Sequence, residues 1–185
     1  VVAEPVEEEE ADPVTEESSE VAIEPESATE AERHPDLIEG SRLMELGCVE
    51  GDQGDYDNSL QHFKAALEVY RTQANRVGEG KALGNLGNVY KAQGQLGQAI
   101  EHITQSLAIS REIGDKASEG NNLGNLGIVY QAQGHYEQAI EHITQAIAIS
   151  REIGNKVSEG NNLGNLGVVY DAQGQYARAI EYYSQ

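Results

Sequence analysis

Four side chains of types that can hold a metal ion or act as a nucleophile stand out in this chain. They are the lone cysteine and three histidines spaced 40 residues apart, namely Cys48, His62, His102 and His142. A zinc ion needs its ligands within about 2 Å of one point, whereas equivalent side chains of neighbouring repeats lie on the order of 10 Å apart. We therefore expect the histidines to be amphipathic residues of a partly exposed helix face, and Cys48 to be an ordinary half-buried residue.

Hydroxyl groups beside basic residues also recur, at Ser110 with Arg111 and at Ser150 with Arg151. These pairs copy the repeat and have no general base in register. Because no nucleophile, base and orienting group converge in the sequence, we expect no enzyme activity, no metal and no cofactor.

The charge balance narrows the class of partner. The 185 residues carry 32 Asp and Glu against 12 Lys and Arg, a formal net charge of -20. Nucleic acids and anionic membranes attract cationic surfaces, so neither is an expected partner. No apolar run approaches the roughly 18 residues of a membrane span, and no signal-peptide core is visible. We expect a cytoplasmic protein.

Three asparagines offer a different kind of chemistry. Asn85, Asn125 and Asn165 recur once per repeat. A side-chain amide both donates and accepts hydrogen bonds, so a ladder of amides can hold either polar group of an extended peptide backbone. In the alternative, each asparagine forms hydrogen bonds only with nearby backbone or water. Recurrence alone does not decide between the two, because near-identical repeats copy every residue whether or not it binds a partner.

The elements that must position these residues are themselves repeated. SEGNNLGNLG occurs at 118–127 and 158–167, and AISREIG at 108–114 and 148–154, in both cases 40 residues apart. A fixed period of this length indicates a solenoid, propeller or array. Apolar residues within each unit follow helical spacing, which predicts two helices per unit. The first helices are predicted near 37–53, 76–93, 116–133 and 156–173, and the second near 56–73, 96–113, 136–153 and 176–185.

Turn and cap residues support these boundaries. Gly134 suits the left-handed position after a helix end, and Gly114 and Gly154 take the same role after the second helices. Asp115 or Asn155, directly afterwards, can accept hydrogen bonds from the first amides of the next helix.

Paired glycines inside the first helices call for close packing. Gly124 and Gly127 fall within one turn, and each costs about 1 kcal/mol relative to alanine. A large side chain that enters the notch would offset this cost. Tyr136 is the expected occupant, with Ala139 as the matching small residue of the second helix. Neighbouring helices would then pack antiparallel, and each unit would bury its faces on the next.

From about residue 36 to the end, the chain resembles the tetratricopeptide repeat family. The family's places are taken by Leu126, Gly127, Tyr130, Gly134, Tyr136, Ala139, Ala146 and, at the aromatic position, Ile143. The Leu-Gly-Asn triplet at 163–165 and the REIGDK run at 111–116 resemble the long-repeat class found in spindle-orientation G-protein regulators, kinesin light chains and bacterial arrays. The resemblance implies an all-α, right-handed superhelical solenoid of antiparallel helix pairs over 35–185, with three full repeats and a truncated fourth.

The resemblance also implies a function. Family members bind peptides or protein segments along a concave groove lined by the first helices, so we expect a non-enzymatic scaffold or adaptor. The alternative is the sensor arm of a larger signalling protein. Carried over by position, the expected partner-binding residues are Lys81, Asn85, Asn88, Lys91, Asn121, Asn125, Ile128, Gln131, Asn161, Asn165, Val168 and Asp171.

The two ends of the chain lead to further expectations. Residues 1–34 are rich in Glu and hold three of the four prolines before Pro35, a composition typical of a disordered acidic tail. This tail would be a solvated linker or, alternatively, an acidic pseudo-ligand that folds back. At the other end Ala179, Ile180 and Tyr183 have no following unit to cover them, so we expect fraying or self-association there.

Overall fold

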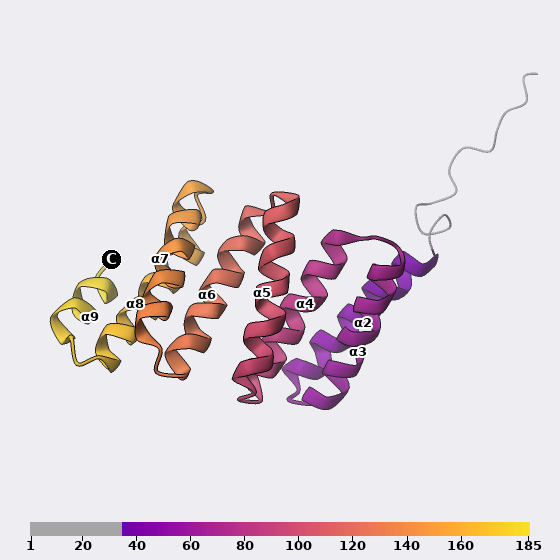
Figure 1. Ribbon diagram of the computed structural model, residues 1–185, viewed down its shortest axis with the longest axis horizontal. Coiled ribbons are helices and arrows are strands. Elements are labelled where there is room, and N and C mark those ends of the chain that lie inside the picture. The colour runs from indigo at the N-terminus through magenta and orange to yellow at the C-terminus, as the bar shows by residue number, and fades with distance from the viewer. Residues whose placement is uncertain (1–34) are drawn as a thin grey trace, which may run out of the picture.

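The computed structural model describes residues 35–185 (Figure 1). The predicted acidic tail, residues 1–34, lies outside this part. The described residues form eight helices and no strand: α2 (Pro35–Asp52), α3 (Tyr56–Thr72), α4 (Arg76–Ala92), α5 (Leu96–Ile113), α6 (Lys116–Ala132), α7 (Tyr136–Glu152), α8 (Lys156–Ala172) and α9 (Tyr176–Tyr183). The all-α prediction is confirmed, and every predicted boundary lies within 2 residues of the observed one.

The helices pair in chain order and stack along the long axis of the molecule, from α2 to α9 (Figure 1). We call the pairs α2–α3, α4–α5, α6–α7 and α8–α9 units 1 to 4. Each first helix also contacts the first helix of the next unit, as α2 contacts α4 and α4 contacts α6. Within the described chain, no second helix contacts another second helix. The first helices therefore lie on the inside of the curve.

The turns and caps form as their residue types predict. Gly134 has φ of 76°, and Gly114 and Gly154 have φ of 73° and 69°, the left-handed region that favours glycine. The Asp115 carboxylate accepts a hydrogen bond from the Ser118 amide at 3.0 Å. These contacts end one helix and begin the next within a few residues, which keeps the period at 40.

The glycine notch is filled by a residue other than the predicted one. A Cβ atom on Gly127 would lie 2.3 Å from Cγ1 of Ile143, and one on Gly87 would lie 2.4 Å from Cγ1 of Ile103. The occupant is thus the isoleucine at the place that the resemblance assigns to an aromatic residue, and the prediction of Tyr136 is wrong. Ile143 lies two turns further along α7, where its side chain and the Ala139 carbonyl lie against Gly127. Ala139 is fully buried at the same contact, as predicted.

The second glycine of the pair faces the next unit instead. A Cβ on Gly124 would lie 2.6 Å from Oδ1 of Asn162, which is buried in α8. At the preceding junction Asn122 donates to Oγ of Ser106 at 2.9 Å, and Ser106 donates to the Gly80 carbonyl at 2.7 Å. Small residues thus leave room for buried hydrogen bonds between units.

An ion pair crosses each junction between units. The pairs are Arg71–Glu79 at 3.1 Å, Arg111–Glu119 at 2.9 Å and Arg151–Glu159 at 2.6 Å. The second oxygen of Glu119 accepts from Lys116 at 2.8 Å, and its side chain is 10% exposed. The hydrogen bond from Lys116, followed by that from Arg111, holds the pKa of Glu119 below its usual range, although burial opposes the shift.

Candidate functional site: an amide-lined groove

All twelve predicted partner-binding residues lie on the first helices of units 2 to 4, which form the inner face. Asn85, Asn125 and Asn165 are half-buried, while Asn121 and Asn161 are exposed. Each of these side chains comes from the middle of a 17-residue helix whose opposite face is buried. The rigid helices therefore fix the spacing of the amides along the groove.

Two adjacent hollows lie along this inner face. The first, about 280 Å³, lies between units 2 and 3, and the second, about 270 Å³, lies between units 3 and 4. Both hollows are lined by Asn88, Asn121 and Asn125, so one continues into the other. Eight of the twelve predicted residues line one or both of them: Lys81, Asn85, Asn88, Asn121, Asn125, Ile128, Asn161 and Asn165. Lys91, Gln131, Val168 and Asp171 line neither.

Lys91 is nevertheless connected to the amides. Its Nζ donates a hydrogen bond to Oδ1 of Asn125 at 2.8 Å, from one first helix to the next. Burial lowers the pKa of Lys91, because desolvation disfavours the charged form. The hydrogen bond from Lys91 occupies the side-chain oxygen of Asn125, so the NH₂ group of Asn125 stays available to donate to a ligand.

Asn88 carries an acceptor that the protein does not use. Its Oδ1 is buried and has no hydrogen-bond partner among residues 35–185. A buried polar atom without a partner costs roughly 1–3 kcal/mol, and a turn of the Asn88 side chain that brings this oxygen to a ligand donor in the groove would remove the penalty. Asn88 also lies between the two hollows, where an extended chain would pass.

A third hollow, between units 1 and 2, was not predicted, and we call it the unit 1 hollow. It has a volume of about 270 Å³ and is lined by Gly47, Cys48, Gly51, Asp52, Tyr56, Ser59, Phe63, Asn85, Asn88, Val89 and Ala92. The sequence held a signal for it: Gly51 stands where the next unit has Lys91, so a long side chain is missing there. That comparison identifies a missing side chain, and the structure shows the space that groups from three helices leave around it.

Cys48 forms part of the wall of this hollow and is exposed, whereas it was predicted to be half-buried. The Asn85 amide lies 3.8 Å from its Sγ. Partial burial of the thiol within the wall, followed by the nearby carboxylates of Asp52 and Glu45, raises the pKa of Cys48. The thiol is therefore less ionised near neutral pH than an ordinary cysteine, which lowers its reactivity.

The three histidines at 40-residue spacing lie on second helices and contact their own units. Nδ1 of His62 is 2.6 Å from a Glu50 carboxylate oxygen. His102 donates to the Gln98 carbonyl at 2.9 Å, and His142 stacks on Tyr130 with ring centroids 5.2 Å apart. Burial lowers the pKa of His142. Within the described chain, no three metal-ligating side chains gather at one point.

Nor does any helix of residues 35–185 have the length and apolar character needed to cross a bilayer.

Comparison with known proteins agrees with this geometry. A family model described as "Tetratricopeptide repeat" matches residues 41–112 and 118–185. No curated protein matches the chain.

Solved structures share the fold at low sequence identity. BtubC (BKLC) from P. vanneervenii is 19% identical, with a TM-score of 0.73 over 81% of this chain and 62% of that one. Aspartyl phosphate phosphatase F from Bacillus subtilis is also 19% identical, with a TM-score of 0.76 over 80% of this chain and 39% of that one. A putative kinesin light chain from Podosopora anserina, with nearly identical TPR-like repeats, is 21% identical, with a TM-score of 0.63 over 78% and 72%. The chain thus spans less than two thirds of the first two proteins, and the likeness is one of fold.

Proposed function

The chain belongs to the tetratricopeptide repeat family, a family of protein-interaction scaffolds, and we propose that it is a non-enzymatic adaptor that holds an extended segment of a partner protein in its groove. The observation that carries the proposal is the pair of continuous hollows, both lined by amides of successive first helices. An amide side chain can donate a hydrogen bond to a peptide carbonyl or accept one from a peptide N–H. The unpaired acceptor of Asn88 supports the same use.

The groove is suited to a backbone more than to one charged end group. Of the two lysines of unit 2, Lys91 already donates to Asn125, and positions 121, 131, 161 and 171 of the next two units carry no base. Binding through amides depends weakly on salt, whereas binding through a lysine clamp depends on it steeply. We therefore propose that peptide binding changes little between low and physiological ionic strength.

The proposal is tested with peptides selected from a displayed random 12-residue library on the immobilised protein. In the test variant Asn85, Asn125 and Asn165 are all changed to Ala. We expect the selected peptides to bind this variant at least about tenfold more weakly, because each lost hydrogen bond is worth roughly 0.5–1.5 kcal/mol. Fluorescence anisotropy of labelled peptides measures the dissociation constants.

A matched control removes three amides from the outer helices, at Gln98, Gln105 and Gln138, all of which are exposed. It should bind as the unchanged protein does, and circular dichroism should show equal helix content in all three proteins. Equal affinity of the groove variant and the control, or a library that yields no binder, would contradict the proposal.

The alternative function, a regulatory arm, would use the same groove and couple its occupancy to an effector on the same polypeptide. Reading the gene beyond the codon for Gln185 tests it, since effector motifs there would favour this function. We also propose that residues 35–185 act as one array separate from the acidic segment 1–34. The cytoplasmic location stays a prediction.

A further inference from the structure

The hollow of unit 1 occupies the place where unit 2 holds its own lysine. Residues of the two units correspond at an offset of 40, so Gly51 corresponds to Lys91 and Asn85 to Asn125. In unit 2 the Lys91 side chain extends along the inner face, and its Nζ donates to Oδ1 of Asn125 at 2.8 Å. In unit 1 the glycine supplies no side chain, and Asn85 lines an open hollow instead.

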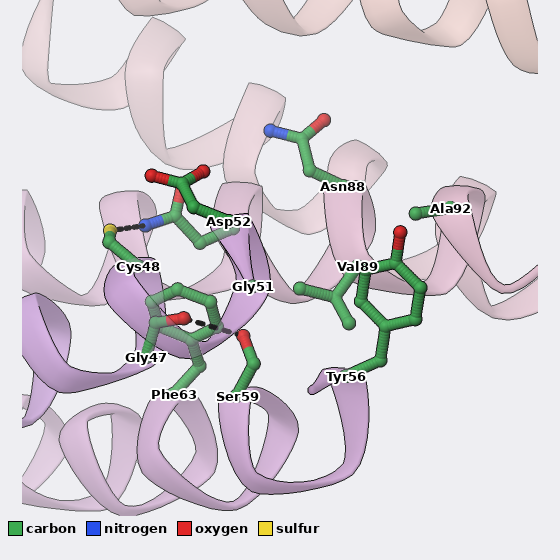
Figure 2. A pocket seen from close by; sticks show the side chains of 11 residues that line it. Gly47, Cys48, Gly51, Asp52, Tyr56, Ser59, Phe63, Asn88, Val89 and Ala92 are labelled. Atoms are coloured by element: carbon green, nitrogen blue, oxygen red, sulfur yellow. Dashed lines mark hydrogen bonds between the residues drawn. The ribbon is translucent and has the colours of Figure 1, made fainter. Parts of the chain in front are cut away.

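The walls of this hollow suit a long side chain with a polar tip. Figure 2 shows Phe63 and Ser59 reaching it from α3, and Val89 and Ala92 from α4. Phe63 is 3% exposed and Val89 7%, so the floor is apolar and firmly packed. Such a floor can cover the methylene stem of a lysine, while the charged head stays near solvent.

The charge at the rim selects a cation. The Asp52 carboxylate lines the hollow where unit 2 has Ala92, and it lies close to Cys48, as the same figure shows. Asp52 and Glu45 both act on the Cys48 thiol and raise its pKa, in addition to the larger effect of burial. None of the residues that line the hollow is basic. The exposed Asp52 carboxylate would repel an anionic side chain and would gain nothing from a neutral one, whereas it attracts an ammonium group.

We propose that the unit 1 hollow is a vacant lysine slot, which receives the side chain of a lysine from the partner segment, with the ammonium group at Asp52 and the amide oxygen of Asn85. This inference rests on the proposed groove function, because it states which side chain the partner presents at the first unit. The lysine slot would fix the register of the partner segment. One lysine of the segment must lie at unit 1, while the backbone of the segment continues past Asn88 into the two amide-lined hollows.

The test uses Cys48 as a tether and needs no partner. The protein is equilibrated with equal concentrations of cystamine and 2-hydroxyethyl disulfide, and intact-mass spectrometry measures the two mixed disulfides on the single cysteine. Cystamine places an ammonium group in the hollow at about the reach of a lysine, and the other reagent is its neutral counterpart. Measuring at equilibrium removes the effect of the raised pKa of Cys48 on the exchange rate. The same mixture with the protein in concentrated guanidinium chloride gives the reference ratio.

We expect the folded protein to favour the cationic adduct about threefold over the reference, as a partly exposed charge pair allows. Asp52→Asn should remove most of this preference. The control Glu137→Gln, which removes one negative charge from the exposed start of α7, should keep it. A folded protein without preference, or a preference unchanged by Asp52→Asn, would overturn the proposal.

A second variant tests occupancy of the slot instead of its charge. A Cβ on Gly51 would lie 3.2 Å from Oγ of Ser59, so Gly51→Lys is combined with Ser59→Ala, the pairing that unit 2 has as Lys91 with Ala99. The introduced lysine should fill the slot and return the adduct ratio to the reference. A retained preference in this double variant would show that the cation binds elsewhere.

These outcomes separate the two proposals. If the folded protein shows no preference for the cationic adduct but peptide binding is as expected, the lysine-slot proposal is wrong and the groove proposal stands. If the preference is retained but peptide binding is unchanged by the substitutions at Asn85, Asn125 and Asn165, the groove proposal is wrong. The lysine slot then has no known ligand.

Discussion

Substitutions at equivalent positions of the repeats change the shape and charge of the inner face. One position on the inner face is Gly51, Lys91, Gln131 and Asp171 in successive units. The glycine opens a hollow, and the lysine bonds Asn125 at 2.8 Å. In unit 1 this change comes with others around the hollow, such as Asp52 where unit 2 has Ala92 and Ser59 where unit 2 has Ala99, so volume and charge change together. The repeat supplies the scaffold, and we expect its departures to supply the specificity.

The charged residues at the junctions give a prediction at the same scale. The pKa of Glu119 is lowered in the folded protein, mainly by the hydrogen bond from Lys116 and also by that from Arg111. A lowered pKa stabilises the fold at pH values above the ordinary value of about 4.3, and this stability is lost as the pH falls through the lowered pKa. Glu119→Gln should therefore cost about 1 kcal/mol of unfolding free energy at pH 7. The cost should shrink towards zero below pH 4 or so.

Urea denaturation at several pH values checks this prediction. Glu137→Gln, on an exposed face of α7, serves as the control and should change the unfolding free energy by less than about 0.5 kcal/mol at any pH. A Glu119→Gln effect that stays constant down to acid pH would show that the loss comes from packing and not from the ion pairs.

At the scale of the helices, the two kinds differ in how they begin. The first helices α4, α6 and α8 are capped by Asn75, Asp115 and Asn155. The side chain of each cap accepts a hydrogen bond from the backbone amide three residues further along the chain. The second helices α5 and α7 start at Gln95 and His135 without such a bond. In units 2 to 4 the inner helices, which carry the groove, are therefore the better capped ones.

This difference predicts a stabilising substitution. In unit 1 the second helix does begin with a cap, Asp55, whose carboxylate accepts from the Asn58 amide at 3.3 Å. Gln95→Asp should copy this cap onto α5 and add about 1 kcal/mol, which corresponds to a rise in Tm of about 3 °C for a chain of this size. Thermal unfolding followed by circular dichroism measures it. The reverse change, Asp55→Gln, should lower Tm by a similar amount, and an unchanged Tm in both variants would contradict the prediction.

At the scale of the whole molecule, every unit depends on its neighbours for burial. The described array ends in α9, where Tyr176 and Ile180 are 64% and 65% exposed. Ala179, expected to be uncovered as well, is 2% exposed because α9 packs on α8. The predicted uncovered face is thus smaller than the sequence indicated, and it consists of the outer side of α9.

Self-association through this face remains a prediction with a direct measurement. We expect the weight-average sedimentation coefficient to rise with protein concentration, since burying exposed apolar side chains is favourable at roughly 25 cal/mol per Å². Ile180→Glu should abolish the rise, because it would bury a charge at the contact. Concentration-independent sedimentation as a monomer, with full helix content, would rule the association out.

The sequence by itself determined the helices, their boundaries and the repeat. Apolar spacing, glycines such as Gly134 and caps such as Asp115 act within a few residues along the chain, so their effect can be read from local pattern. Recurrence of Asn85, Asn125 and Asn165 at equal spacing then placed them on equivalent helices, and the inner face followed from the family resemblance.

Only the tertiary structure decided which side chains meet. Ile143, and not Tyr136, enters the notch at Gly127, because the closest approach of two helices depends on their crossing and not on the order of residues. The hollow at Gly51 likewise exists because groups from α2, α3 and α4 surround a missing side chain. Such gaps form between residues that are distant in the sequence, so a local sequence pattern does not predict their size or shape.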